Sequence, residues 1–148
     1  MELLFATHNL HKVEEIRLSV PDLSIKGLAE AGIEAIMEEP FDSLEENAYS
    51  KASTIFNIAK RPSFSEDTGL EVFALNHAPG VHSARYAGEE RSFKKNIDKL
   101  LNALKSHQNR AAQFRTVICL ILEGKAHYFE GICAGTISWH QQVRRFWL

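Results

Sequence analysis

The start of the chain changes from an apolar run to a polar loop and then to a helical pattern. The stretch is MELLFATHNLHKVEEI, and its run ELLFA is short and apolar, as expected of a buried strand. After the polar interruption, Val13, Ile16 and Val20 recur at the spacing of one helix face. The pattern therefore predicts a strand, a loop and a helix, in that order.

Two later segments carry stronger helical patterns. Ser43 and Glu46 form a capping box ahead of an apolar stripe that ends before Pro62. The stripe consists of Leu44, Ala48, Ala52, Ile55 and Ala59. Ser92 can cap another helix, whose apolar residues again lie on one face. These residues are Phe93, Ile97, Leu100, Leu101 and Leu104.

The remaining apolar segments read as strands. The region 21–40 is broken by Pro21, Gly27 and Gly32 and has room for one short strand. PSFSEDTGLEVFAL predicts two short strands around an acidic turn at 66–69, and AQFRTVICLILEGKAHYFEGICAGTI predicts a long hairpin turning at 123–125. Because strands and helices interleave, the fold class is α/β, with a mixed central sheet flanked by helices.

Composition narrows the class of protein. The 148 residues fit a single domain, 1–148, and no apolar run is long enough to span a membrane. The net charge of −2, without blocks of like charge, argues against nucleic-acid and membrane-surface partners and favours a small molecule. Glu2 stands where an export signal would be basic, and Cys119 and Cys133 read as free, buried thiols, so we expect a cytoplasmic protein. Tyr128 and Phe129 read as core residues.

The loop after the first strand has the chemistry of a phosphate site. A helix that begins directly after a strand presents unpaired N–H groups and a positive dipole end, which attract phosphate. Thr7, Asn9 and Lys12 add a hydroxyl, an amide and a cation. The alternative is that Thr7 and Asn9 only cap the helix while Lys12 lies on a solvated face. Without glycines, the loop matches neither a P-loop nor a dinucleotide fingerprint.

Acidic residues from separate elements form a second group of candidates. The group comprises Glu38, Glu39, Glu45, Glu46, Glu66 and Asp67. Gathered carboxylates can hold Mg²⁺ together with substrate phosphates, and one more can activate a water. The alternatives are that Glu45 and Glu46 only complement the helix dipole and that EDTG is an ordinary turn. The loop APGVHSARYAG, with Arg85 and Tyr86, supports the functional interpretation.

Two other kinds of site find little support. His8 and His11 are three residues apart, but no Cys or further His stands nearby in sequence to complete a zinc site. A serine hydrolase would need a Gly-x-Ser-x-Gly nucleophile elbow, which the chain lacks.

Five segments together resemble the inosine triphosphate pyrophosphatase family, also called dITP/XTP pyrophosphatases. They are ATHNLHKVEEI, LEENAYSKA, SEDTGLEV, APGVHSARYAG and FEGICAGTI, in the family's order from Leu3 to about Ile137. The resemblance implies Mg²⁺-dependent hydrolysis of non-standard purine nucleoside triphosphates (ITP, dITP, XTP) to the monophosphate and pyrophosphate, by a cytosolic homodimer.

The resemblance also assigns roles to residues. It implies that Asp67 is the catalytic residue that activates water, and that Glu39, Glu66 and Asp67 bind the metal. The substrate-binding residues that it implies are Thr7, His8, Asn9, Leu10, His11, Lys12, Lys51 and Thr68. Glu66 stands in place of the more usual Asp, and Thr68 in place of the more usual Ser.

The end of the chain departs from the family. There FEGICAGTI leads to a GGFGYDP segment and later to purine-selecting residues, whereas here the tail 138–148 ends in SWHQQVRRFWL. Shifted by one nucleotide, codons compatible with RRFWL, together with the first base of a following stop codon, encode Gly-Gly-Phe-Gly-Tyr. We therefore hypothesise a truncated, frameshifted member of the family that lacks the C-terminal part of the fold and whose register is lost near Ser138. The alternatives are an inactive nucleotide-binding fragment and a Maf-like nucleotide pyrophosphatase.

Overall fold

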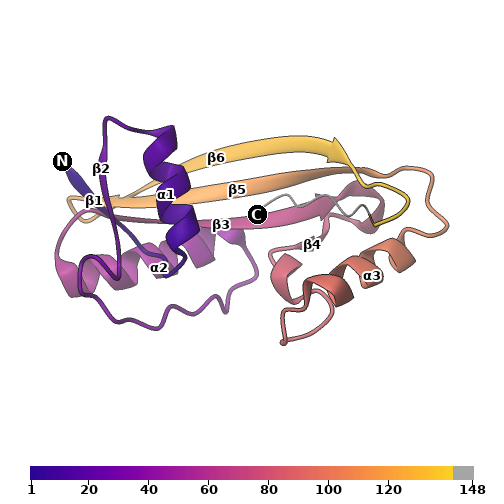
Figure 1. The fold of residues 1–148 in the computed structure, drawn as a ribbon, viewed down its shortest axis with the longest axis horizontal. Helices are drawn as coiled ribbons and strands as arrows, with labels where there is room; N and C mark the ends of the chain where they lie inside the picture. The colour runs from indigo at the N-terminus through magenta and orange to yellow at the C-terminus, as the bar shows by residue number, and fades with distance from the viewer. Residues whose placement is uncertain (142–148) are drawn as a thin grey trace. The chain divides into compact units, whose positions relative to one another are not determined.

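The computed structural model describes residues 1–141, so the end of the divergent tail, 142–148, lies outside the described residues. The first half of the chain forms β1 (Glu2–Phe5), α1 (Leu10–Ser19), β2 (Ser24–Gly27), α2 (Leu44–Ala59) and β3 (Ser63–Val72). The second half forms the short helix η1 (Phe73–Leu75), β4 (Ala78–Gly80), the short helix η2 (Ser83–Arg85), α3 (Phe93–Ala103), β5 (Ala111–Leu122) and β6 (Lys125–Thr136). Figure 1 shows this order along the ribbon.

The strands form one mixed sheet in the order β2-β1-β3-β5-β6, with β4 paired to β3. β1 runs parallel to β2, and it pairs in parallel with the start of β3, through Leu4 with Ser63 and Phe5 with Phe64. β4 is antiparallel to β3. The predicted α/β class with a mixed sheet and flanking helices is confirmed.

The described residues fall into two compact units, which divide β3, β5 and β6 between them. One unit contains residues 1–67 and 116–130, and the other contains residues 68–115 and the described residues from 131 on. Each unit is described by itself below. The single domain expected from chain length stays a prediction.

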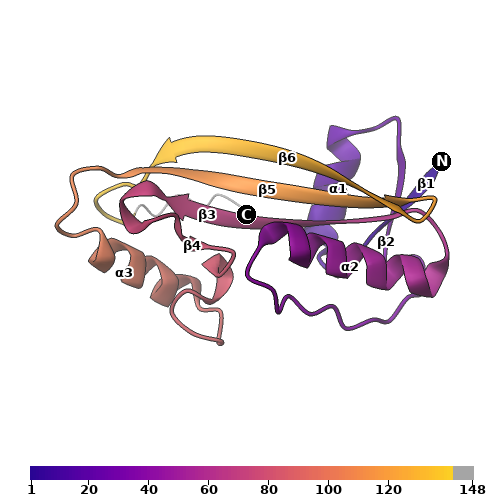
Figure 2. The same ribbon diagram turned by 180° about the vertical axis from the view of Figure 1, so that it is seen from behind.

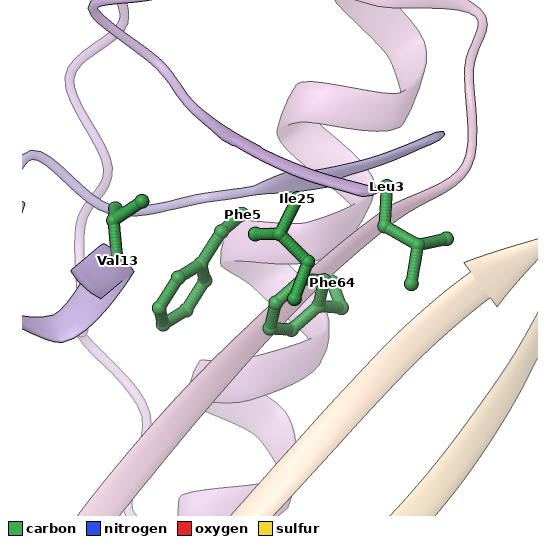
Figure 3. Close-up of a cluster of buried hydrophobic side chains, with 5 residues drawn as sticks. All are labelled: Leu3, Phe5, Val13, Ile25 and Phe64. Carbon is green, nitrogen blue, oxygen red and sulfur yellow. The ribbon is translucent and has the colours of Figure 1, made fainter. Parts of the chain in front are cut away.

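In the first unit, α1 packs on one face of the sheet. Its core there contains Leu3, Phe5, Val13, Ile25 and Phe64, which Figure 3 shows gathered between the strands and the start of α1. The rings of Phe5 and Phe64 stack with their centroids 4.5 Å apart. Side chains alternate along a strand, so the odd residues of β1 and the even residues of β3 face α1.

The opposite face of the same unit is covered by α2. Leu4 and Ala6 point to this side and pack with Leu28 and Ile55. Figure 1 and Figure 2 show α1 and α2 on different sides of the strands. The helix α2 begins where the capping box predicts, because Ser43 Oγ accepts a hydrogen bond from Glu46 N at 3.2 Å. It ends at a left-handed Lys60, before Pro62.

The second unit has its own core around α3. Val72, Leu100, Leu104 and Ala112 are buried together there. The predicted cap of α3 is confirmed, since Ser92 Oγ accepts a hydrogen bond from Lys95 N at 3.3 Å.

The predicted acidic turn at 66–69 is wrong, because these residues lie within the continuous strand β3. Further along β3, Leu70 pairs with Gly80 of β4. A Cβ atom on Gly69 would lie 2.5 Å from Gly80 O, so glycine here permits the close approach of two strands and does not form a turn. Strand pairing overrides the turn preference of the EDTG sequence.

The predicted hairpin of β5 and β6 is confirmed. Glu123 and Gly124 join the strands. Their φ values of 52° and 74° are typical of the tight two-residue turns that connect the strands of a hairpin. The prediction that Tyr128 and Phe129 are core residues is wrong, because they are 51% and 56% exposed on β6. Every residue of β6 is exposed among the described residues, since β6 is the last strand of the sheet.

The cysteine prediction holds in part. Cys119 and Cys133 are both free thiols, but Cys119 is buried whereas Cys133 is exposed on β6. Within residues 1–141, no helix is both long enough and apolar enough to cross a membrane.

Candidate functional site

The predicted site residues of the first unit gather beyond the carboxyl end of β1. The pairing of β1 with β3 ends at Phe5 and Phe64, while β3 continues to Glu66 and Asp67. The loop that leads into α1 starts at the same edge, after Phe5. In open α/β sheets, ligands bind outside the carboxyl ends of the parallel strands. The topology therefore brings the phosphate-type loop and the β3 carboxylates to one edge.

Side chains of the loop itself cap α1. Thr7 Oγ1 accepts a hydrogen bond from Asn9 N at 3.1 Å, and Asn9 Oδ1 accepts hydrogen bonds from the N–H groups of His11 and Lys12 at 3.0 and 3.4 Å. The capping alternative for Thr7 and Asn9 thus describes their geometry. A capped helix start still carries the positive end of the dipole, which favours a nearby phosphate.

The other loop residues have different surroundings. His8 Nε2 lies 2.7 Å from Ala35 O, which ties this loop to the segment that follows β2. Leu10 is 59% exposed at the start of α1, and His11 is also exposed. Lys12 does not lie on a solvated face as the alternative held, because it is half-buried and its Nζ donates to Glu66 Oε1.

The adjacent carboxylates of β3 point to opposite faces of the sheet. Phe64 packs on the α1 side, so the alternation of the strand places Glu66 on that side as well. Asp67 points the other way, where Asn47 Nδ2 of α2 donates to its Oδ2 at 3.2 Å.

Lys51 joins the acidic residues around Asp67. It is 9% exposed on α2, and its Nζ donates to Glu39 Oε1 at 2.6 Å and to the main-chain oxygen of Glu66 at 2.7 Å. Lys51 lies four residues after Asn47, so both side chains leave the same face of α2. The helix therefore presents a cation and an amide to the loop of Glu39 and to β3.

The electrostatic surroundings weaken the acidity of Asp67. Burial, above all, raises its pKa from 3.8 to about 6, and the negative charges of Glu39 and Glu66 act in the same direction. The ammonium of Lys51 and the hydrogen bond from Asn47 oppose this rise. A carboxyl group whose pKa lies near neutrality can accept and release a proton under physiological conditions.

The carboxylates fit Mg²⁺ in the kind of ligand that they offer. Glu39, Glu66 and Asp67 supply oxygen atoms, and their mutual repulsion at Asp67 is what a cation would relieve. Among residues 1–141, however, no group of three or more His, Cys, Asp or Glu side chains is arranged to hold a metal ion. Glu66 and Asp67 themselves lie on opposite faces of β3. Such a site suits an ion that takes further ligands from substrate phosphates, as Mg²⁺ usually does.

Some predicted functional residues belong to the second unit. Thr68 is exposed in β3, directly after the boundary between the units. In the loop around η2, Lys99 Nζ donates to Tyr86 O at 2.7 Å and lies 4.3 Å from the centre of the Tyr86 ring. Arg85 is half-buried at the end of η2. These residues are described within their own unit only.

The sequence reasoning missed Asn47. Its side chain is 1% exposed and contacts both Asp67 and the main chain of Phe41. A signal was present, because asparagine is a poor residue for a helix interior and here it stands one turn before Lys51. A pocket of about 310 Å³ lies beside the same helix, and of the candidate acidic residues Glu45 and Glu46 line it, whereas Glu39, Glu66 and Asp67 do not. It is lined by Phe41, Glu45, Glu46, Tyr49, Ser50, Ser53 and Tyr128.

Known proteins resemble the chain over nearly its whole length. The sequence model of the Ham1 family matches residues 3–146 of this chain. A dITP/XTP pyrophosphatase of Christiangramia forsetii is 46% identical over 138 residues, which make up 93% of this chain and 73% of that protein. A dITP/XTP pyrophosphatase of Porphyromonas gingivalis is 48% identical over 139 residues, with 93% of this chain and 72% of that protein covered.

Solved structures agree with these matches. The Staphylococcus aureus Ham1 protein superposes with a TM-score of 0.88 at 34% identity, covering 99% of this chain and 77% of that one. A HAM1 protein from Coxiella burnetii gives a TM-score of 0.87 at 30% identity, covering 96% and 75%. The sequence matches and the superposed structures thus agree with the family that the motif residues resemble. The chain belongs to the Ham1 family.

Proposed function

We propose that this protein hydrolyses non-standard purine nucleoside triphosphates, such as ITP, dITP and XTP, to the nucleoside monophosphate and pyrophosphate. The observation that carries the proposal is Asp67, a carboxylate with a pKa raised to about 6 that is held beside Lys51 at the carboxyl end of β1. The dITP/XTP pyrophosphatases among the relatives support the choice of substrate.

The reaction needs a base and a site for the triphosphate. The oxygen of a water molecule bonds to the α-phosphorus, while the bond from that phosphorus to the oxygen of the leaving pyrophosphate breaks. Asp67 takes up the proton that the water loses, which a carboxylate with a pKa near the working pH does efficiently. The hydrogen bond from Asn47 holds one carboxylate oxygen in place during this step.

The lysines bind the phosphates. Lys12 stands in the first turn of α1, beside the positive dipole end that attracts the triphosphate. Lys51 is nearly buried next to Glu39 and the main chain of Glu66, so its charge is poorly screened by water. Phosphate oxygens would replace Glu66 as the partner of Lys12 and Glu39 as the partner of Lys51. The two carboxylates would then be available to a metal ion.

Mg²⁺ is part of the proposal. Glu39, Glu66 and Asp67 would hold it together with the phosphates, and it would supply neutralising charge on the triphosphate. We also propose that the protein acts as a homodimer in the cytoplasm, as the family resemblance implies. Proposed substrate contacts from Thr7 to Lys12 complete the site in the first unit, and the family resemblance also implies a substrate contact from Thr68.

Initial rates of pyrophosphate release test the proposal. The purified chain is assayed with ITP, dITP and XTP, and with ATP and GTP for comparison, with Mg²⁺ and with a chelator. We expect release that prefers the non-standard purines, requires Mg²⁺ and is lost in Asp67→Asn. A folded chain that binds ITP but releases no pyrophosphate would overturn the proposal in favour of an inactive nucleotide-binding protein.

A further inference from the structure

Asn47 directs the hydrogen bonds of its amide toward two separate segments of the first unit. Its Oδ1 accepts a hydrogen bond from Phe41 N at 3.0 Å, and its Nδ2 donates to Phe41 O at 3.3 Å and to Asp67 Oδ2 at 3.2 Å. The amide thus pairs with the peptide groups of Phe41 on one side and with a carboxylate on the other. Its side chain is almost fully buried.

The orientation of this amide is fixed by its partners. Rotating it by half a turn would place Oδ1 against two acceptors, Phe41 O and Asp67 Oδ2, and Nδ2 against the Phe41 N–H group. Both exchanges cost hydrogen bonds, so one arrangement is strongly preferred. Neither an acid nor an apolar residue at position 47 could make the same three contacts.

The contact with Phe41 extends to Glu39 through the backbone. Pro40 has a fixed φ, and it also restricts the conformation of the residue before it. Residues 33–40 have no regular secondary structure, and apart from the packing of Ile33, Ala35 and Met37 on the core, hydrogen bonds to flanking residues hold this loop. Holding the Phe41 peptide therefore places the backbone of Glu39, whose carboxylate Lys51 holds at 2.6 Å.

We propose that Asn47 is a positioning residue that fixes the loop of Glu39 relative to Asp67 and so sets the geometry of the carboxylates for a divalent cation. The inference rests on the function proposed above, because it assigns Glu39 and Asp67 to that site. Asn47 touches neither substrate nor metal, and it acts only through its neighbours. Residues that orient metal ligands in this way typically contribute about 10- to 100-fold to metal affinity or activity.

The chain offers a matched control in the second unit. Asn96 on α3 also holds a loop, because its Oδ1 accepts from Ala87 N at 2.8 Å while its Nδ2 donates to Ser83 O and Ala84 O. None of these partners is a carboxylate. Asn96→Ala therefore removes a comparable set of hydrogen bonds without touching an acidic group.

The test measures, by calorimetry, the binding of Mn²⁺ to protein saturated with a non-hydrolysable ITP analogue, in the wild type, Asn47→Ala, Asn47→Leu and Asn96→Ala. Asn47→Leu fills the buried position with an apolar side chain of similar size and leaves no cavity, so it serves if the alanine variant fails to fold. We expect Mn²⁺ to bind at least about 10-fold more weakly to both variants of Asn47. Asn96→Ala should bind Mn²⁺ as the wild type does, with only its melting temperature lowered.

Steady-state kinetics with ITP give a second readout. We expect Asn47→Ala to lower kcat about 10-fold or more and to leave KM within about 2-fold, since the loop from Thr7 to Lys12 is untouched. Unchanged Mn²⁺ affinity in a folded variant of Asn47 would overturn the inference.

The inference and the proposed function can fail separately. If the wild type binds Mn²⁺ but does not hydrolyse ITP, the proposed function fails, and the Mn²⁺ affinities still decide the role of Asn47. If the wild type hydrolyses ITP and the variants of Asn47 match it in both readouts, only the inference fails. A wild type that neither binds Mn²⁺ nor hydrolyses ITP would overturn both.

Discussion

Replacing Asp67 by asparagine should stabilise the protein at neutral pH while it abolishes hydrolysis. Burial and the nearby carboxylates raise the pKa of Asp67 from 3.8 to about 6. The charged form is therefore less favourable in the folded protein than in the unfolded chain. Asparagine carries no charge, and its amide can still offer an oxygen to the Nδ2 group of Asn47.

The size and pH range of this effect follow from the two pKa values. A rise of about two units corresponds to roughly 3 kcal/mol, which we reduce to about 1.5 kcal/mol because Asp67 is only partly buried and solvent screens its charge. Below the unfolded pKa the carboxyl group is neutral in both states, so the cost is absent. As the pH rises to the folded pKa the cost develops in full, and it stays constant at higher pH.

Chemical denaturation at several pH values measures the difference between the two proteins. In the presence of a chelator, we expect Asp67→Asn to be more stable by about 1.5 kcal/mol near pH 7.5, or about 3–6 °C in melting temperature. Near pH 3, below the unfolded pKa, the two proteins should be equally stable. Added Mg²⁺ should stabilise the wild type more than the variant. A difference that does not change with pH, or a less stable variant at pH 7.5, would refute this reasoning.

Three further substitutions test other parts of the account. Lys51→Met should lower kcat/KM for ITP by at least about 100-fold, because it removes a nearly buried cation beside Glu39 and Asp67, and a loss under 3-fold would contradict its role. Ser43→Ala should cost about 1 kcal/mol in urea denaturation by removing the α2 cap while kcat per folded molecule stays the same; an unchanged midpoint would argue against the cap. Gly69→Ala should destabilise the fold by about 2 kcal/mol or more in the same assay, because its Cβ would collide with Gly80 O, and a neutral effect would contradict this close approach.

The sequence predicted the elements whose signals are local. The cap at Ser43 and the apolar stripe after it define α2, and the glycine turn at Gly124 defines the hairpin. The sequence also indicated Asn9 as a helix cap, because its hydrogen bonds go to residues that are close in the chain. Such features depend on a few consecutive residues, so the pattern alone contains them.

The features that the sequence did not predict depend on partners distant along the chain. The EDTG segment has turn-forming residues, and only its place in β3, between β1 and β5 in the sheet, makes it part of a strand. Once it is a strand, Glu66 and Asp67 must face opposite sides, which divides two carboxylates that the sequence placed in one turn. Asn47 contacts Asp67 across 20 residues, so spacing could not have assigned it to the site.

The exposure of β6 has the same kind of origin. Tyr128 and Phe129 have core-like side chains, but they remain 51% and 56% exposed on the last strand of the sheet. Burial of a hydrophobic side chain is favourable in free energy, but whether the side chain is buried depends on the elements that pack around it.

The most direct test of the central claim is the identity of the products formed from ITP, followed by phosphorus NMR with the wild type and Asp67→Asn in parallel. The account predicts inosine monophosphate and pyrophosphate in equal amounts from the wild type, with Mg²⁺ present, and unchanged ITP with the variant. Formation of the diphosphate and inorganic phosphate, or equal turnover by Asp67→Asn, would contradict it.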